Sequence, residues 1–307
     1  MDRFLAKRIR DFIRAFISDP LAHWPFIPMS RQLCGNTAGA KQNLYGSSQL
    51  AYFRLFGRRD GKKATDPWVL DNARVLRREG VLKLETPIVP VDTIKLIQRK
   101  FDQKAKASTQ ANEYIVSFGG EDIVKDVPEV FDIMKCQRLR ELIQEFFASA
   151  FHVDQIVYRR TFPVPDQVLR QGEIYSDYWH CDSSPTSEIA LFINLIDIAP
   201  DCGPTMVVDK NHSSSLIRKY YRGRRNKKTV EMLDSALEQG GYAQAFTGQA
   251  GSMLFAQTTK CLHRASIPAE GKMRDWLSFR FLPKSAPIVA DRIIRNRVLH
   301  YTHGLDV

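Results

Sequence analysis

Two residues that commonly bind metal ions lie two positions apart in the segment YWHCDSS. On an extended strand, His180 and Asp182 would point to the same face, about 7 Å apart along the backbone. Cys181 would then point the opposite way, so we do not expect it to be a ligand. An imidazole and a carboxylate on one face can both reach one metal ion.

A third ligand is needed for the triad of two histidines and one carboxylate, which holds Fe(II) and leaves positions open for a co-substrate and dioxygen. We expect this ligand to be His263 in KCLHRAS, after the predicted strand GSMLFA. Arg274 follows at the start of MRDWLSFRF, where alternation puts Arg274 and Ser278 on one face and apolar residues on the other. A guanidinium there can bind a carboxylate through two parallel hydrogen bonds.

Polar and aromatic side chains around these residues are candidates for contacts with bound molecules. Asn194 in FINLIDI could hydrogen-bond a co-substrate from a strand that faces the interior, with a satisfied core amide as the alternative. Ser278 shares its predicted face with Arg274 and is a second candidate for the same role. Tyr175 and Tyr178 precede the His180 segment and are candidates to line a substrate pocket, although aromatic residues at such positions pack as often.

A basic run with two tyrosines, RKYYRGRRNKK, occupies residues 218–228 between the metal-binding segments. Arg222 and Arg224 are candidates for contacts with an anionic substrate such as an acyl-CoA, a phosphorylated sugar or a lipid head group, and a solvated loop is the alternative. The formal charge of +11 agrees with an anionic partner without identifying it. Nucleic acid is the least favoured partner, because only this run and the overall charge support it.

The order of the predicted elements indicates an α+β chain. Helices are predicted over residues 71–80 and 91–103, the second capped by Asp92, and a longer helix over 128–151. After Val153 the pattern changes to short strands separated by turns, which are QIVYRRTF, EIYSDYWHCD, EIALFINLIDI, PTMVVD, GSMLFA and WLSFRFL. This pattern predicts an antiparallel sandwich or barrel in the second half of the chain.

We divide the chain at its first regular pattern. Residues 1–66 are predicted to form a basic amphipathic helix and an extended arm, and residues 67–307 the domain that carries the site. Apolar residues recur at helical spacing over 1–17, with basic residues on the other side. We expect this helix to dock on the body of the protein or on a second subunit, with an anionic membrane surface as the alternative.

Composition sets broader limits. With 44% hydrophobic and 26% charged residues, the 307-residue chain is typical of a globular protein with a sizeable core. Its five scattered cysteines exclude a disulfide framework and a zinc ribbon, and its apolar runs are far shorter than the roughly 20 residues of a membrane-spanning helix. Charges interrupt any signal-peptide core near the N-terminus. We expect a cytoplasmic protein, with peripheral contact at the inner face of a membrane as an alternative and a homo-oligomer left open.

Together these segments resemble the phytanoyl-CoA dioxygenase (PhyH-like) family of Fe(II)- and 2-oxoglutarate-dependent oxygenases. The resemblance rests on WHCDSS, FINLIDIAPDCGPTMVVDKNHS and LHRASIPAEGKMR, with LRREGVLKLETPIVPVDTIKLIQ before them. It covers roughly residues 70–283. One departure is DKNHS at 209–213, where the family has PGSH.

The resemblance implies a double-stranded β-helix, or jelly-roll and cupin-like core, with the N-terminal helices packed on its outer face. It implies His180, Asp182 and His263 as iron ligands and Arg274 as the residue that binds the distal carboxylate of 2-oxoglutarate. It also implies a dioxygenase that hydroxylates a small or lipid-linked anionic substrate and releases succinate and CO2.

Two alternatives stay open at this point. One is a non-catalytic jelly-roll protein that binds an anionic ligand or has a regulatory role, against which the presence of all three ligands and the arginine argues. The other is a cupin-like protein that holds Mn(II), Co(II) or Ni(II) on the same ligands.

Overall fold

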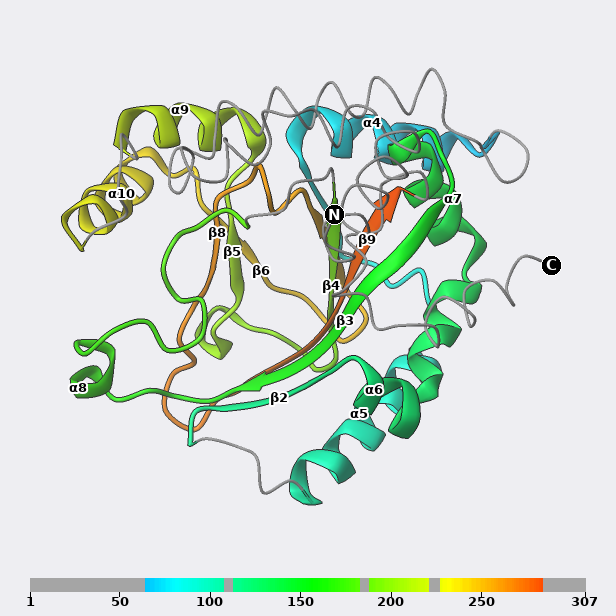
Figure 1. Cartoon of the computed structure of the whole chain (residues 1–307), viewed down its shortest axis with the longest axis horizontal. Coiled ribbons are helices and arrows are strands. Elements are labelled where there is room, and N and C mark those ends of the chain that lie inside the picture. The colour runs from blue at the N-terminus through cyan, green and yellow to red at the C-terminus, as the bar shows by residue number, and fades with distance from the viewer. Residues whose placement is uncertain (1–63, 108–112, 183–187, 221–226, 284–307) are drawn as a thin grey trace, which may run out of the picture.

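The computed structural model describes residues 64–107, 113–182, 188–220 and 227–283. Within them, two antiparallel sheets form the centre of the protein (Figure 1). The six-stranded sheet has the order β1-β7-β4-β9-β3-β2, and the three-stranded sheet the order β6-β5-β8. The strands are β1 (Val81–Leu84), β2 (Ile115–Gly119), β3 (Phe151–Thr161), β4 (Ile189–Asn194), β5 (Thr205–Val207), β6 (Gln244–Phe246), β7 (Met253–Ala256), β8 (His263–Ala265) and β9 (Arg274–Pro283).

Among the described residues, helices occupy most of 67–147 and the insertion between β5 and β6. They are α4 (Pro67–Glu79), α5 (Val91–Ala107), α6 (Glu121–Asp126), η1 (Pro128–Lys135), α7 (Gln137–Phe147), α8 (Asp166–Leu169), η2 (Pro200–Cys202), α9 (Lys210–Tyr220) and α10 (Lys227–Gly240). The chain is therefore a mixed protein of helices and antiparallel sheet, as the sequence predicts. No helix of the described residues has both the length and the apolar character that a membrane crossing requires.

The main core lies between the six-stranded sheet and the helices on one of its faces. Buried residues of α4, α5 and α7, such as Leu76, Phe101 and Phe146, pack in one cluster with Leu277 and Phe279 of β9. Figure 1 shows α5, α6 and α7 on one side of β3 and β9, with the three-stranded sheet on the other. Alternation along β9 turns Leu277, Phe279 and Phe281 to the helices, and it puts Arg274 and Ser278 on the opposite face, as the sequence predicts. Asp275 also lies on the helical side, where it pairs with Arg160.

The sequence around α4 shows why the first strand begins where it does. Asp66 caps the helix by accepting a hydrogen bond from the Trp68 amide at 2.9 Å. Gly80 ends it in the left-handed conformation, with φ 74°, and donates its amide to the Leu76 carbonyl. The chain turns there directly into β1, whose residues pair with β7.

The predicted strand over EIYSDYWHCD is wrong. Residues 173–182 form no strand: four of them are bends, and within the segment only His180 makes a β-bridge, to His263. The cause is local, because the Asp177 carboxylate accepts hydrogen bonds from the amides of Ile174 and Tyr175 at 2.8 and 3.0 Å. Such side-chain bonds to the backbone favour a turn over a strand ladder.

Two further local predictions are corrected. The helix expected over 128–151 is two elements, η1 and α7, separated by Cys136 in an extended conformation. The second helix, α5, begins at Val91, so Asp92 lies inside its first turn and is not its cap. The amides of Thr93 and Ile94 donate to the carbonyl of the preceding Pro90 instead.

Some predicted features cannot be compared with the structure. The N-terminal helix over 1–17, the extended arm up to residue 63, and Arg222 and Arg224 lie outside the described residues. The four described cysteines, Cys136, Cys181, Cys202 and Cys261, carry free thiols.

Candidate metal centre

The predicted ligands come from two segments that the backbone ties together. The amide of His180 donates to the carbonyl of His263 at 3.1 Å, and the amide of His263 donates back at 2.9 Å. His263 is also the first residue of β8, which pairs with β5. Two residues beyond the bridge, the amide of Asp182 donates to the carbonyl of Thr258 at 2.9 Å. These bonds bring residues far apart in the sequence to one end of the smaller sheet.

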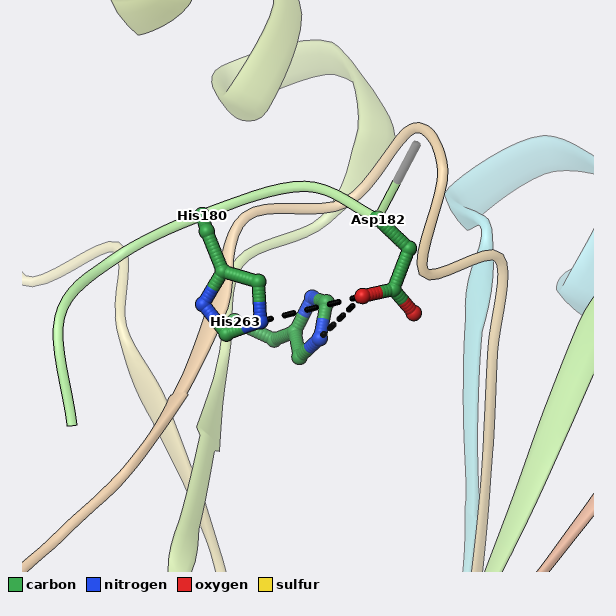
Figure 2. Close-up of side chains that lie close together, drawn as sticks. All are labelled: His180, Asp182 and His263. Atoms are coloured by element: carbon green, nitrogen blue, oxygen red, sulfur yellow. Dashed lines mark ion pairs between the residues drawn. The ribbon is translucent and has the colours of Figure 1, made fainter. Parts of the chain in front are cut away.

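The three side chains converge on a common point (Figure 2). The Nε2 atoms of His180 and His263 lie 3.7 and 3.8 Å from Oδ1 of Asp182. One ligand atom from each residue lies within 4.8 Å of the other two. Two imidazole nitrogens and one carboxylate oxygen suit Fe(II) and other divalent transition metals, so the donor set fits the metal that the sequence predicts.

Backbone carbonyls fix the ring orientation of both histidines. Nδ1 of His180 lies 2.7 Å from the carbonyl oxygen of Tyr178, and Nδ1 of His263 lies 3.0 Å from that of Cys261. A carbonyl can only accept, so each Nδ1 carries a hydrogen, and Nε2 is the ring nitrogen left to bind a metal. Metal-binding histidines use this arrangement.

The surroundings of Asp182 favour its ionised form. Burial acts to raise the pKa of Asp182, but the charge of His263 and a hydrogen bond from Thr258 outweigh it and hold the pKa below its usual value. The Thr258 hydroxyl also lies 3.1 Å from Oε1 of Glu188, which is buried beside Arg280. Thr258 therefore links the carboxylate ligand to a buried polar group.

Arg274 is a buried cation without an acidic partner. Its side chain is 2% exposed, its Nη1 donates to the Thr205 hydroxyl at 3.2 Å, and its Nε has no partner. Burial lowers the pKa of Arg274 to about 9, with Tyr175 opposing this change and the like charge of Arg159 adding to it. No carboxylate among the described residues pairs with it, so an anion would satisfy both its charge and its unused donor.

The two other residues predicted to contact the co-substrate, Asn194 and Ser278, differ in whether their side chains are free to form a hydrogen bond. Asn194 is 2% exposed, and its side-chain Nδ2 has no hydrogen-bond partner. It pairs across the sheet with Trp276, which lies two residues after Arg274 on β9. Ser278 is half-buried, and its hydroxyl lies 3.5 Å from the carbonyl of Val157 in the neighbouring strand. The side chain of Asn194 therefore has an unused hydrogen-bond donor, whereas the hydroxyl of Ser278 already makes a long hydrogen bond to the backbone.

The predicted substrate tyrosines have different places. Tyr175 is buried, donates its hydroxyl to the carbonyl of Phe162 at 3.2 Å, and lies near enough to Arg274 to influence its pKa. Tyr178 is half-buried, and its backbone carbonyl orients His180.

The sequence interpretation missed three residues. Thr205 on β5 contacts Arg274, and Thr258 contacts Asp182, but single threonines in short segments carry no periodic signal. Arg159 of β3 lies opposite Trp276 on the face of the sheet that carries Arg274. Alternation within QIVYRRTF separates Arg159 from Arg160, which is the signal that could have identified it.

Comparison with known proteins gives matches only in structure. No family model and no curated protein matches the chain. EctD from S. alaskensis, solved with 2-oxoglutarate and 5-hydroxyectoine, is similar with a TM-score of 0.52 at 16% identity, over 70% of this chain and 76% of EctD. AviO1 from Streptomyces viridochromogenes Tue57 has a TM-score of 0.49 at 15% identity, over 71% of this chain and 96% of AviO1.

A third similar structure is the epimerase SnoN in complex with Fe3+, alpha ketoglutarate and nogalamycin RO. Its TM-score is 0.49 at 13% identity, over 71% of this chain and 85% of SnoN. At these identities, the likeness to EctD is one of fold alone. The resemblance to the phytanoyl-CoA dioxygenase family stays a prediction, because no family model matches.

Proposed function

We propose that the protein is an Fe(II)- and 2-oxoglutarate-dependent dioxygenase that hydroxylates a small or lipid-linked anionic substrate and releases succinate and CO2. One observation carries the proposal: two imidazole Nε2 atoms and one carboxylate converge within 4.8 Å. The unpaired Arg274 on the adjoining sheet supports it.

The proposal includes a double-stranded β-helix as the core. In its support, β7, β4, β9 and β3 are neighbours in one sheet and face the β6-β5-β8 sheet, with the contact of Arg274 and Thr205 between them. EctD, which is similar in fold, was solved with 2-oxoglutarate.

The chain's own residues position the reactants. His180, Asp182 and His263 would hold the metal, with both rings fixed by carbonyl acceptors. Arg274 would bind the distal carboxylate of 2-oxoglutarate with the help of Thr205. Bound iron and 2-oxoglutarate would supply the oxidation of the substrate by dioxygen.

Apolar and aromatic groups beside Arg274 would keep water from the reacting groups. Trp276 is 9% exposed and packs edge-on against Phe192, with ring centroids 5.5 Å apart. Excluding water strengthens the electrostatic interactions of Arg274 and limits side reactions.

The test is anaerobic addition of Fe(II) and 2-oxoglutarate to the purified protein, with the visible metal-to-ligand charge-transfer band as the readout. We expect a band that is lost in His180→Ala, Asp182→Ala and His263→Ala and that needs more 2-oxoglutarate in Arg274→Gln. His212→Ala is the matched control, because this histidine of α9 pairs with Asp209, which precedes the helix, and is no part of the triad.

A folded, iron-loaded protein without this band would contradict the proposal. The non-catalytic binding protein would then be the better interpretation of the same fold.

A further inference from the structure

Arg159 is a second guanidinium beside the proposed co-substrate site. It lies on β3 directly opposite Trp276 of β9. Its Cζ is 5.4 Å from the centroid of the Trp276 ring, and Cζ of Arg274 is 5.6 Å from the same centroid. One indole ring thus contacts two cations, each through a cation–π interaction.

Arg159 has no charge partner among the described residues. Its Nε is buried without a hydrogen-bond partner, and burial lowers the pKa of Arg159. Its neighbour Arg160 points to the helical side of the sheet, where it pairs with Asp275 and with Asp102 of α5. The fold therefore neutralises one of two consecutive arginines and leaves the other with an unused donor.

Further unused polar groups lie around Arg159. The Thr161 hydroxyl, two residues along the same face, and Nε1 of Trp276 are both buried without a partner. Ser117, which pairs with Arg159 from β2, is exposed. Buried polar groups without hydrogen-bond partners therefore lie close to an exposed position of β2. This arrangement suits a polar ligand that would satisfy them.

The two carboxylates of 2-oxoglutarate do not account for Arg159. 2-Oxoglutarate has two carboxylates, one at the keto acid end that would bind the metal and one that would bind Arg274. Neither remains for Arg159. We infer that Arg159 binds a carboxylate of the primary substrate, an inference that rests on the proposed function.

The chemistry of this part of the sheet favours a carboxylate over a phosphate. A planar guanidinium with a free Nε–H matches a carboxylate through two parallel hydrogen bonds. Strands β2, β3 and β9 carry no lysine that would add charge for a dianion. The substrate class is therefore a small carboxylic acid whose apolar part contacts the ring of Trp276.

The first experiment separates the two arginines. In the anaerobic Fe(II) titration, the 2-oxoglutarate dissociation constant of Arg159→Gln should stay near the wild-type value, whereas that of Arg274→Gln should rise about tenfold or more. Arg99→Gln, which removes an exposed arginine of α5, is the charge-matched control. Equal weakening in Arg159→Gln and Arg274→Gln would overturn the inference by making Arg159 a co-substrate ligand.

The second experiment probes the carboxylate site directly. Acetate, hexanoate and benzoate are each compared with the primary amide of the same size, using saturation-transfer NMR on the full chain loaded with Zn(II) and 2-oxoglutarate. We expect the wild-type protein to prefer at least one carboxylate over its amide by about tenfold, with the preference lost in Arg159→Gln. Arg159→Lys should keep part of it, because the charge remains without the planar donor pair.

The outcomes distinguish the inference from the function on which it rests. Absence of the charge-transfer band in wild-type protein contradicts the function. A normal band combined with no carboxylate preference, or with a preference that Arg159→Gln retains, overturns the inference alone.

Discussion

The two imidazole ligands of the candidate centre are oriented by the main chain. The carbonyls of Tyr178 and Cys261 accept the Nδ1–H bonds of His180 and His263. Substitution of the Tyr178 side chain therefore leaves the acceptor for His180 in place. The carboxylate ligand differs, because Asp182 depends on the side chain of Thr258.

That dependence gives a prediction for Thr258→Val. The valine keeps the shape but removes the hydroxyl that, after the charge of His263, contributes most to holding the pKa of Asp182 down, so metal affinity should fall by about 10- to 100-fold. Thr259→Val is the matched control, since the neighbouring threonine is also buried and is not among the groups that shift the pKa of Asp182. Competition with a metal-binding dye measures the affinity, and similar losses in both variants would contradict a specific role for Thr258.

Arg274 illustrates how a residue proposed to bind an anion can weaken the ligand-free fold. We expect Arg274→Met to raise the free energy of unfolding of the ligand-free protein by about 1–4 kcal/mol, because it removes a buried charge without an acidic partner. The same variant should lose 2-oxoglutarate binding. Denaturant titration measures the first effect and the charge-transfer band the second.

Arg160→Met is the contrasting control for this prediction. Arg160 is paired with Asp275, which is fully buried, so its removal should lower the free energy of unfolding. A loss of stability in both variants would show that the charge of Arg274 is compensated in the ligand-free protein.

The sequence predicts that three residues of suitable chemistry come together, but it does not predict which charged side chains form ion pairs. The triad residues could be selected because an imidazole, a carboxylate and a second imidazole at these spacings suit a metal. The different surroundings of Arg159 and Arg160 could not be selected, because both are basic residues in the same strand. Only the position of Asp275 and Asp102 in three dimensions shows which arginine is neutralised.

At the level of elements, the turn from α4 into β1 depends on close packing at Gly80. A Cβ there would lie 2.7 Å from Sγ of Cys261 and 3.0 Å from Cβ of Lys210, and the residue has a positive φ. Gly80→Ala should therefore lower the free energy of unfolding by about 2–4 kcal/mol, from backbone strain and crowding together.

Gly271→Ala separates these two causes. Gly271 has a similar φ of 70°, but no atom lies within 4 Å of its added Cβ, so only the strain of about 1–2 kcal/mol should appear. Equal losses in the two variants, measured by denaturant titration, would show that crowding against Cys261 contributes nothing.

The contact between α5 and the large sheet depends on a buried ionic group. Arg160 connects Asp102 of α5 with Asp275 of β9, and Asp275 also accepts a hydrogen bond from Tyr158 at 2.7 Å. Asp275→Asn should cost about 3 kcal/mol, because it leaves the charge of Arg160 with Asp102 alone.

Asp71→Asn is the control for that variant. Its partner Arg74 lies on the same exposed turn of α4, so the loss should be below about 1 kcal/mol. Denaturant titration compares the two variants, and a loss below 1 kcal/mol in Asp275→Asn would show that the buried pair is dispensable.

Element prediction from the sequence succeeds where apolar periodicity is strong. The two faces of β9 follow from its alternation, and the end of α4 follows from Gly80. The start of α4 is predicted too late, because the helix begins at Pro67 after its cap Asp66 and not at Asp71. The segment before His180 reads as a strand by composition, but Asp177 turns its backbone through bonds that no hydrophobic pattern records. Cys136 likewise interrupts a sequence with continuous helical periodicity.

Across the whole molecule, the metal should be a stabilising element. At about 100 times its dissociation constant, a metal that binds only the folded state raises the free energy of unfolding by about 2.7 kcal/mol. Thermal unfolding with Fe(II) under anaerobic conditions, and again after a chelator, measures this effect. Asp182→Ala should show no difference between the two conditions, and an equal stabilisation in that variant would place the metal elsewhere.

The fold class could be predicted for the whole molecule because helices precede strands in the sequence. The helices of the insertion between β5 and β6 are harder to predict from the sequence. The first of them, α9, begins at Lys210 within the segment DKNHS, and its basic end continues into a run that reads as loop. Charge and turn-forming residues dominate that stretch and hide its helical spacing.

The bridge between His180 and His263 has a mechanical consequence. About 80 residues separate His180 from His263, and they include β4 of the larger sheet and β5 of the smaller one. A metal on both imidazoles would therefore tie this part of the chain into a closed loop, as a disulfide does. Under force applied to the two ends of the chain, the tied loop would withhold about 270 Å of contour length until the metal bonds break. Chelation would release that length without cleaving any covalent bond.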